Sequence, residues 1–252
     1  MNLYGADHHL MVLTDMIDAD VHKHSFIQVT VSLRSAFGIE LGEERVNCKG
    51  IVIDSNVNHR LDGRGQPLLL LLMDSTSNLA ASFKKQLSGR AYCEFPYKTI
   101  ERAASYVLDN YGDIGDSASY NLFLSELLQL LGVDNVKSTA ADERVNEFIR
   151  LLKDCKGSEH SVDSLAKQVC LSGSRLSHLF KANTGISLSG YLVLHKLQKA
   201  IYLIFNGMSI TEAALSAGFD SPSHFAAASK QLLGMAAKDI RKDSVFLKVS
   251  SL

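Results

Sequence analysis

The spacing of apolar and polar positions changes near Tyr97. Before that point, short runs of β-branched and aliphatic residues alternate with turn-forming residues, a pattern typical of strands. The clearest runs are residues 26–33, 50–53 and 68–73. Many short strands with turns between them predict a small β-barrel or sandwich in this part of the chain.

After Tyr97 the apolar positions recur at helical spacing. One amphipathic helix is expected around residues 100–108, and a second around 122–131, ended by Gly132. The apolar faces of the two helices either pack on the barrel of their own chain or pair with a second copy. The spacing leaves both alternatives open.

Residues 133–141 are polar and aperiodic, so we expect a linker there. The rest of the chain predicts helices at 142–155, 162–170, 173–183, 188–205, 210–217 and 222–233. The expected fold class is therefore α+β. A first domain of strands and two helices spans 1–132, an all-helical domain spans 142–243, and a short tail spans 244–252.

Two parts of the helical domain, residues 161–185 and 209–234, share one plan of a short helix, a tight turn and a second helix. Small residues stand where the paired helices are expected to cross: Ala166 and Cys170 in the first, Ala213 and Gly218 in the second. This pattern indicates two helix-turn-helix motifs, whose second helices can enter the major groove of DNA. The apolar helix between them, 188–205, is expected to be buried.

The helical domain resembles the AraC/XylS family of bacterial transcription regulators. The resemblance rests on Ser164-Leu165-Ala166, Leu171-Ser172, Leu176-Ser177-His178-Leu179-Phe180-Lys181, Thr184-Gly185-Ile186-Ser187, Leu197-Gln198-Lys199-Ala200, Ser209-Ile210-Thr211-Glu212-Ala213-Ala214, Ala217-Gly218-Phe219-Asp220-Ser221 and Ser223-His224-Phe225. It implies that the two motifs read successive major-groove segments of promoter DNA. It also implies an activator, which would have RNA polymerase as a partner.

In the first reading helix, Leu176, Leu179 and Phe180 belong to the core by their spacing. The resemblance implies that the outward residues bind DNA: Ser174, Arg175, Ser177, His178 and Lys181. Serine and histidine can bond base edges, whereas arginine and lysine also bind phosphates. The plainer interpretation is that these residues are solvated surface.

The corresponding outward residues of the second reading helix are Ser223, Ala226, Ala227 and Lys230, followed by Lys238 and Arg241. Alanine cannot form a side-chain hydrogen bond to a base, although it can touch a thymine methyl group. Departures from the family pattern also occur at Ser229, Ala237 and Ile240. We therefore expect this motif to contribute position, through phosphate contacts, more than sequence reading. The rival interpretation is that it serves only as packing.

His22 and His24 followed by Gln28, with His59 later, resemble the histidine motif of a cupin barrel. Metal-binding cupins have a carboxylate where Gln28 stands, so we expect no metal and no cofactor here. Hydrogen-bonded barrel histidines are the plainer interpretation. The functional interpretation is that these residues lie near a pocket for a small effector.

Composition adds a few limits. Residues 1–141 carry a net charge of −5 and residues 142–243 a net charge of +3, which fits a nucleic-acid partner for the helical domain. The four cysteines are far apart and form no CxxC pair, which indicates neither a zinc site nor a disulfide framework. With no signal peptide or apolar run of membrane length expected, a cytoplasmic protein without membrane contact is predicted.

Three functions remain open from the sequence. The first is a sequence-specific DNA-binding regulator, reading bases mainly through its first motif and controlled by an effector or by dimerisation. The second is an adaptor or an inhibitor of a related regulator that kept the fold without binding DNA. The third is a metal-dependent cupin enzyme, which Gln28 disfavours, and no other catalytic motif is evident.

Overall fold

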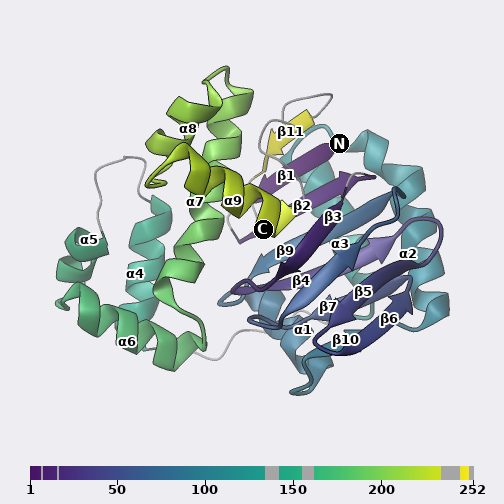
Figure 1. Cartoon of the computed structure of the whole chain (residues 1–252), viewed down its shortest axis with the longest axis horizontal. Coiled ribbons are helices and arrows are strands. Elements are labelled where there is room, and N and C mark those ends of the chain that lie inside the picture. The colour runs from purple at the N-terminus through teal and green to yellow at the C-terminus, as the bar shows by residue number, and fades with distance from the viewer. Residues whose placement is uncertain (7, 16, 134–141, 155–161, 234–244, 250–252) are drawn as a thin grey trace.

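The structure is a computed structural model that describes residues 1–6, 8–15, 17–133, 142–154, 162–233 and 245–249. Figure 1 shows two facing sheets flanked by helices, and a separate group of helices beside them. This arrangement confirms the α+β class, with strands first and the helical region after them. No helix among the described residues is long and apolar enough to cross a membrane.

Among the described residues, the larger sheet has seven strands in the order β10-β7-β4-β9-β2-β1-β11. Its strands are β1 (Asn2–Ala6), β2 (His9–Thr14), β4 (Phe26–Ser32), β7 (Gly50–Ile53), β9 (Leu68–Asp74), β10 (Tyr92–Glu94) and β11 (Val245–Lys248). The smaller sheet has the order β3-β8-β5-β6. Its strands are β3 (Asp18–His22), β5 (Phe37–Leu41), β6 (Glu44–Cys48) and β8 (His59–Asp62).

The two sheets are separate in the described part of the chain, so the barrel or sandwich expected from the strand pattern is an open two-sheet sandwich. Central strand β9 explains the packing. Leu68, Leu70 and Leu72 join the core between the sheets, whereas Leu69 and Leu71 join the core on the opposite face. A strand covered on both faces is apolar throughout, which is why β9 has no polar alternation.

In the described part of the chain, three helices cover the outer face of the larger sheet, one more than the two predicted: α1 (Asn78–Leu87), which was not predicted, α2 (Tyr97–Asn110) and α3 (Ser117–Leu130). Ile100, Val107 and Leu127 are buried there. The main apolar stripes of α2 and α3 therefore pack on the sheet of their own chain. Most of their apolar residues are thus not available for pairing with a second copy. Leu108 and Leu122 remain 43% and 65% exposed.

The helical region contains α4 (Glu143–Asp154), α5 (Val162–Gln168), α6 (Gly173–Thr184), α7 (Leu188–Phe205), α8 (Ile210–Ser216) and α9 (Pro222–Leu233). These bounds agree with the predicted helices to within one or two residues. Helix α7 has buried residues along its whole length, from Leu188 to Ile204, and carries a helix-turn-helix unit at each end.

The C-terminal segment contains a strand, which the sequence did not predict. Strand β11 pairs in parallel with β1 at the edge of the larger sheet. Phe246 of β11 stacks on Phe205 at the end of α7, with 5.5 Å between ring centroids. The segment expected to be a tail thus joins the end of the helical region to the first strand.

Candidate nucleic-acid interface

The first helix-turn-helix unit, α5 with α6, is held by short-range contacts. The Ser172 hydroxyl caps α6 by accepting a hydrogen bond from the Arg175 backbone N–H at 3.2 Å. Gly185 ends the helix in the left-handed conformation, with φ of 77°. A Cβ atom on Gly173 would overlap the carboxylate of exposed Asp163, which would have to move aside.

The faces of α6 separate as the sequence predicted. Leu176 and Phe180 are fully buried, and Leu179 is half-buried. All the outward residues are exposed: Ser174, Arg175, Ser177, His178 and Lys181. Figure 1 places α5 and α6 on the side of the helical region away from the sheets, so this polar face is open to a partner.

A shallow surface hollow lies between α6 and the start of α7. It is lined in part by Ser177, His178 and Lys181 of α6 and by Ser187 and Ser189 at the N-terminus of α7. The Ser177 hydroxyl donates a hydrogen bond to the Gly173 carbonyl at 2.9 Å, which leaves its oxygen lone pairs to accept from a partner. The hollow therefore combines a cation, an imidazole and hydroxyl groups on one face.

The turns of the two units use the same backbone conformation. Cys170 has φ of 58° and Gly218 has φ of 88°, so both adopt the left-handed region. Cys170 and Gly218 are exposed, which corrects the expectation that they pack where the helices cross. Ala166 and Ala213 are fully buried, as predicted for crossing positions.

The second unit begins with a well-formed capping box. Ser209 accepts the Glu212 backbone N–H, and the Glu212 carboxylate accepts the Ser209 backbone N–H. These bonds to Ser209 hold the pKa of Glu212 below its usual value. On α9, Ser223, Ala226, Ala227 and Lys230 are exposed. Lys238 and Arg241 lie outside the described residues.

Helix α9 is held against the smaller sheet by polar contacts near β3. The Lys230 ammonium lies 3.0 Å from the Asp20 carboxylate, and the Gln231 amide donates to the Lys23 carbonyl at 2.8 Å. Gln198 of α7 donates to the carbonyls of Ala6 and His9 at 3.1 and 2.9 Å. Sequence reasoning missed these contacts, because residues about 190–210 positions apart leave no periodic signal.

The two units also differ in their cores. Residues from α4, α5, α6 and the start of α7 form a separate cluster around Phe148 and Phe180. In contrast, buried residues of α8, α9 and the rest of α7 belong to one cluster with the core between the sheets. The second unit is therefore packed as part of the N-terminal domain.

The histidines proposed for an effector pocket lie close together. His24, Gln28 and His59 are buried, and His22 is half-buried. Burial lowers the pKa of His24 to about 3 and of His59 to about 4, with smaller lowering from neighbouring histidines. These two rings are thus neutral at pH 7. His24 Nε2 lies 3.1 Å from the Gln28 amide oxygen.

Comparison with known families identifies the helical region. A profile of the family described as "Helix-turn-helix domain" matches residues 165–243. The arabinose operon regulatory protein of Salmonella typhimurium is 29% identical over 133 residues, covering 52% of this chain and 47% of that protein. Its counterpart in Escherichia coli K12 is 32% identical over 102 residues, covering 40% of this chain and 35% of that protein. The helical region is an AraC-family helix-turn-helix domain.

A further relative of this AraC-family domain is the HTH-type transcriptional activator RhaS of Escherichia coli O139:H28, 29% identical over 135 residues. That match covers 52% of this chain and 48% of RhaS. The chain spans about half the length of the curated relatives it matches.

Most of the chain has the fold of a solved protein. Apo ToxT from Vibrio cholerae strain SCE256 superposes with a TM-score of 0.56 over 92% of this chain and 96% of that one. The sequences are 10% identical, so the likeness concerns the fold. Unsaturated-fatty-acid-bound ToxT from the same strain gives a TM-score of 0.52 at 11% identity, covering 92% and 95% of the two chains.

Proposed function

We propose that the protein is a transcription regulator that binds promoter DNA and activates transcription, with α6 as its base-reading helix. The observation that carries the proposal is the exposed polar face of α6 within an AraC-family domain. A relative of that domain is named an HTH-type transcriptional activator, which favours activation and a contact with RNA polymerase.

The outward residues of α6 have two different roles, which follow from their chemistry. Ser174, Ser177 and His178 bond base edges, because hydroxyl and imidazole groups can both donate and accept. Arg175 and Lys181 bind phosphates, which fixes the register of the helix on the duplex. The hollow beside α7 brings His178 and Lys181 to one surface and supports this assignment.

In this proposal the second unit positions the protein on the DNA through phosphate contacts. Ala226 and Ala227 offer only methyl groups, so α9 can add little base discrimination. Ser223 and Lys230, together with Lys238 and Arg241, are its proposed DNA contacts. Lys230 is already paired with Asp20, so its use on DNA requires α9 to leave β3.

The N-terminal domain supplies control. ToxT has been solved with an unsaturated fatty acid, which supports a small effector for a protein of the same fold. The exposed side chains of Leu108 and Leu122 are candidates for pairing two copies of the chain. A regulator of this kind acts in the bacterial cytoplasm, where the promoter is.

The test is DNA binding across a salt series, measured by fluorescence anisotropy on promoter fragments from the neighbourhood of the gene. Wild type should bind one fragment specifically and lose affinity steeply as salt rises. Lys181→Ala should reduce the slope of log affinity against log salt by about 1, the contribution of one phosphate contact. Lys230→Ala is the matched variant at the equivalent position of α9, and it should reduce the slope by less than Lys181→Ala does, because Lys230 is paired with Asp20.

His178→Ala separates base reading from phosphate binding. It should reduce discrimination between the site and mutated sites by about fivefold or more, while the salt slope stays at the wild-type value. Absence of specific binding by wild type at low salt would overturn the proposal. That result would favour the adaptor, because α9 is docked on the sheets and carries alanines where reading residues are expected.

A further inference from the structure

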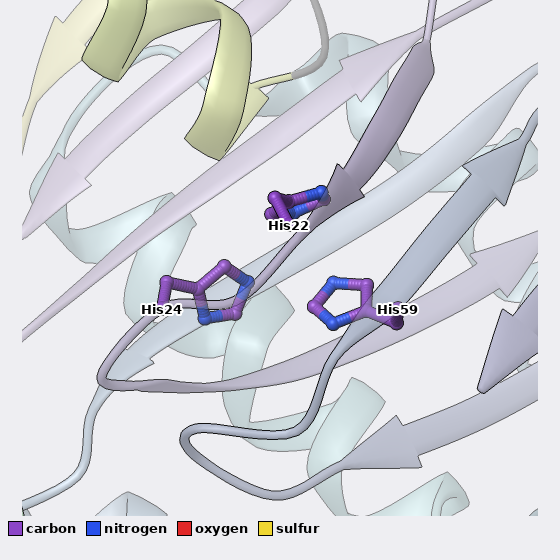
Figure 2. Close-up of side chains that lie close together, drawn as sticks. All are labelled: His22, His24 and His59. Atoms are coloured by element: carbon purple, nitrogen blue, oxygen red, sulfur yellow. The ribbon is translucent and has the colours of Figure 1, made fainter. Parts of the chain in front are cut away.

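Three histidines converge at one end of the smaller sheet, as Figure 2 shows. His22 ends β3, His24 follows it, and His59 begins β8. The ring centroids of His22 and His59 are 4.3 Å apart, and those of His24 and His59 are 5.0 Å apart. One nitrogen from each ring lies within 4.8 Å of the others.

Backbone carbonyls orient all three rings in the same way. The Nδ1 atom of His22 lies 2.6 Å from the Asp20 carbonyl oxygen, that of His59 lies 2.9 Å from Val57, and that of His24 lies 3.2 Å from Phe26. A carbonyl oxygen can only accept, so Nδ1 of His22 and of His59 carries the proton and their Nε2 atoms keep the lone pair, whereas the His24 ring has an acceptor oxygen beside each nitrogen. Histidines that bind metals are oriented by such bonds from the other ring nitrogen.

The Nε2 atoms are available for a ligand. His59 Nε2 is buried and has no hydrogen-bond partner among the described residues. In the Nδ1–H tautomer, His24 Nε2 presents its lone pair toward the Gln28 amide oxygen, 3.1 Å away. That separation is close to the roughly 3.3 Å between two ligand atoms on one tetrahedral metal ion.

We propose that His22, His24 and His59 bind one divalent transition-metal ion through their Nε2 atoms. Neutral imidazole suits Zn²⁺, Co²⁺, Ni²⁺ and Cu²⁺ in preference to Mg²⁺ or Ca²⁺. The rings close by about an ångström on binding, because nitrogens on one zinc ion are about 3.4 Å apart. The Gln28 oxygen or a water molecule completes the site, and half-buried His22 gives the ion a path from solvent.

The site shares its strand with the contacts that hold α9. The Asp20 carbonyl orients His22, and the Asp20 carboxylate pairs with Lys230. The Lys23 carbonyl, between two of the metal ligands, accepts from Gln231. A bound ion joins this segment to β8 and fixes both contacts, so the metal favours the state in which α9 is docked. This coupling to DNA rests on the proposed function.

Metal binding is tested first without DNA, on the full chain purified with chelator. Co²⁺ titration followed by visible absorption, and Zn²⁺ titration by calorimetry, should each give one ion per chain. His59→Ala and His22→Ala should weaken binding by about 100-fold or more. His224→Ala removes an exposed histidine from outside the cluster and should bind as wild type does.

Two variants guard against loss of folding. His22 is half-buried, so His22→Ala should keep the wild-type circular dichroism spectrum even if His59→Ala does not. Equal Zn²⁺ affinity in wild type and folded His22→Ala would overturn the site. Such a result would leave DNA binding in the absence of metal untouched, so the two proposals fail separately.

The coupling is tested by DNA affinity with and without one equivalent of Zn²⁺. Zn²⁺ should weaken binding by wild type about threefold to tenfold, and it should not change binding by His22→Ala. Asp20→Ala removes the partner of Lys230 and should reduce the Zn²⁺ effect while keeping the metal. An unchanged DNA affinity in metal-loaded wild type would overturn the coupling.

Discussion

The two helix-turn-helix units have the same local design and different surroundings. A serine hydroxyl caps α6 in the first unit and α8 in the second. In both units the turn contains a residue in the left-handed conformation, and an alanine lies where the helices cross. The first unit has a core of its own, and the outward face of its second helix, α6, is polar and exposed. The second unit shares the core of the sheets, and its second helix, α9, is bonded to the β3 segment.

The formation of α6 and α9 and their exposure to a DNA partner therefore have different causes. Local sequence is sufficient to build α6 and α9, since capping and turn residues act over a few positions. Availability depends on what the rest of the chain packs against the helix. A structural change in the N-terminal domain can therefore reach α9 through β3, whereas the contacts described for α6 are with α4, α5 and α7.

The largest expected effect comes from emptying each core. Phe180→Ala and Phe225→Ala each remove a fully buried ring and should cost about 3–5 kcal/mol of unfolding free energy in the affected unit. Hydrogen-exchange mass spectrometry should show Phe180→Ala raising exchange in α4–α6 and leaving the strands protected. Phe225→Ala should raise exchange in α8, α9 and the strands that share its core.

Matching patterns of increased exchange in the two variants would show that the cores are not separate. The two helix-turn-helix units would then share one core and would not differ in their packing. Leu215→Ala, at a 52% exposed position of α8, serves as the control and should change exchange little.

How far the sequence predicted the fold depends on the range of the forces involved. Periodicity and caps placed the six helices from α4 to α9 within one or two residues, because those signals are local. Strand β11 was missed, since its pairing with β1 joins the two ends of the chain. The choice between a barrel and a sandwich could not be made from the sequence, because curvature and closure depend on strand pairing between distant residues.

The candidate sites show the same limit. The outward face of α6 followed from spacing, and the structure exposes all five of its polar residues. The convergence of His22, His24 and His59 needed the pairing of β3 with β8, which puts His22 opposite His59. The substitution of Gln28 argued against a metal in the sequence, but it did not reveal the orientation of the rings.

An intermediate effect is expected from acidification. Burial lowers the pKa of His9 to about 3, and the charge of His8 adds a smaller lowering. The unfolded chain binds the proton near pH 6.5 and the folded chain only near 3, so stability falls as pH drops below 6.5. His9 alone should cost about 2 kcal/mol of unfolding free energy between pH 7.5 and 5.

The loss should fall on the sheets and the second unit, because the His9 carbonyl accepts from Gln198 and its ring bonds Tyr120 at 2.6 Å. Urea denaturation followed by circular dichroism at the two pH values measures it. His9→Gln removes the titration and keeps an amide for Tyr120, so its stability should fall by about 2 kcal/mol less. Identical pH dependence in both proteins would exclude His9 as the cause.

The smallest expected effect comes from giving α9 a reading residue. Ala227 occupies the position that His178 occupies in α6, and it is exposed. Ala227→Arg should increase affinity up to about tenfold, and only for sites with guanine in the second half, since one bidentate contact is worth about 1–3 kcal/mol. The gain stays near the lower limit because α9 must first leave Asp20 and Lys23. Ala227→Leu adds volume without hydrogen bonds and should give no gain.

If Ala227→Arg changes neither affinity nor base preference on any site, the second unit does not reach DNA and α9 serves as packing. A gain that grows when Asp20 is also replaced would show that docking on β3 limits how much of the DNA site is read.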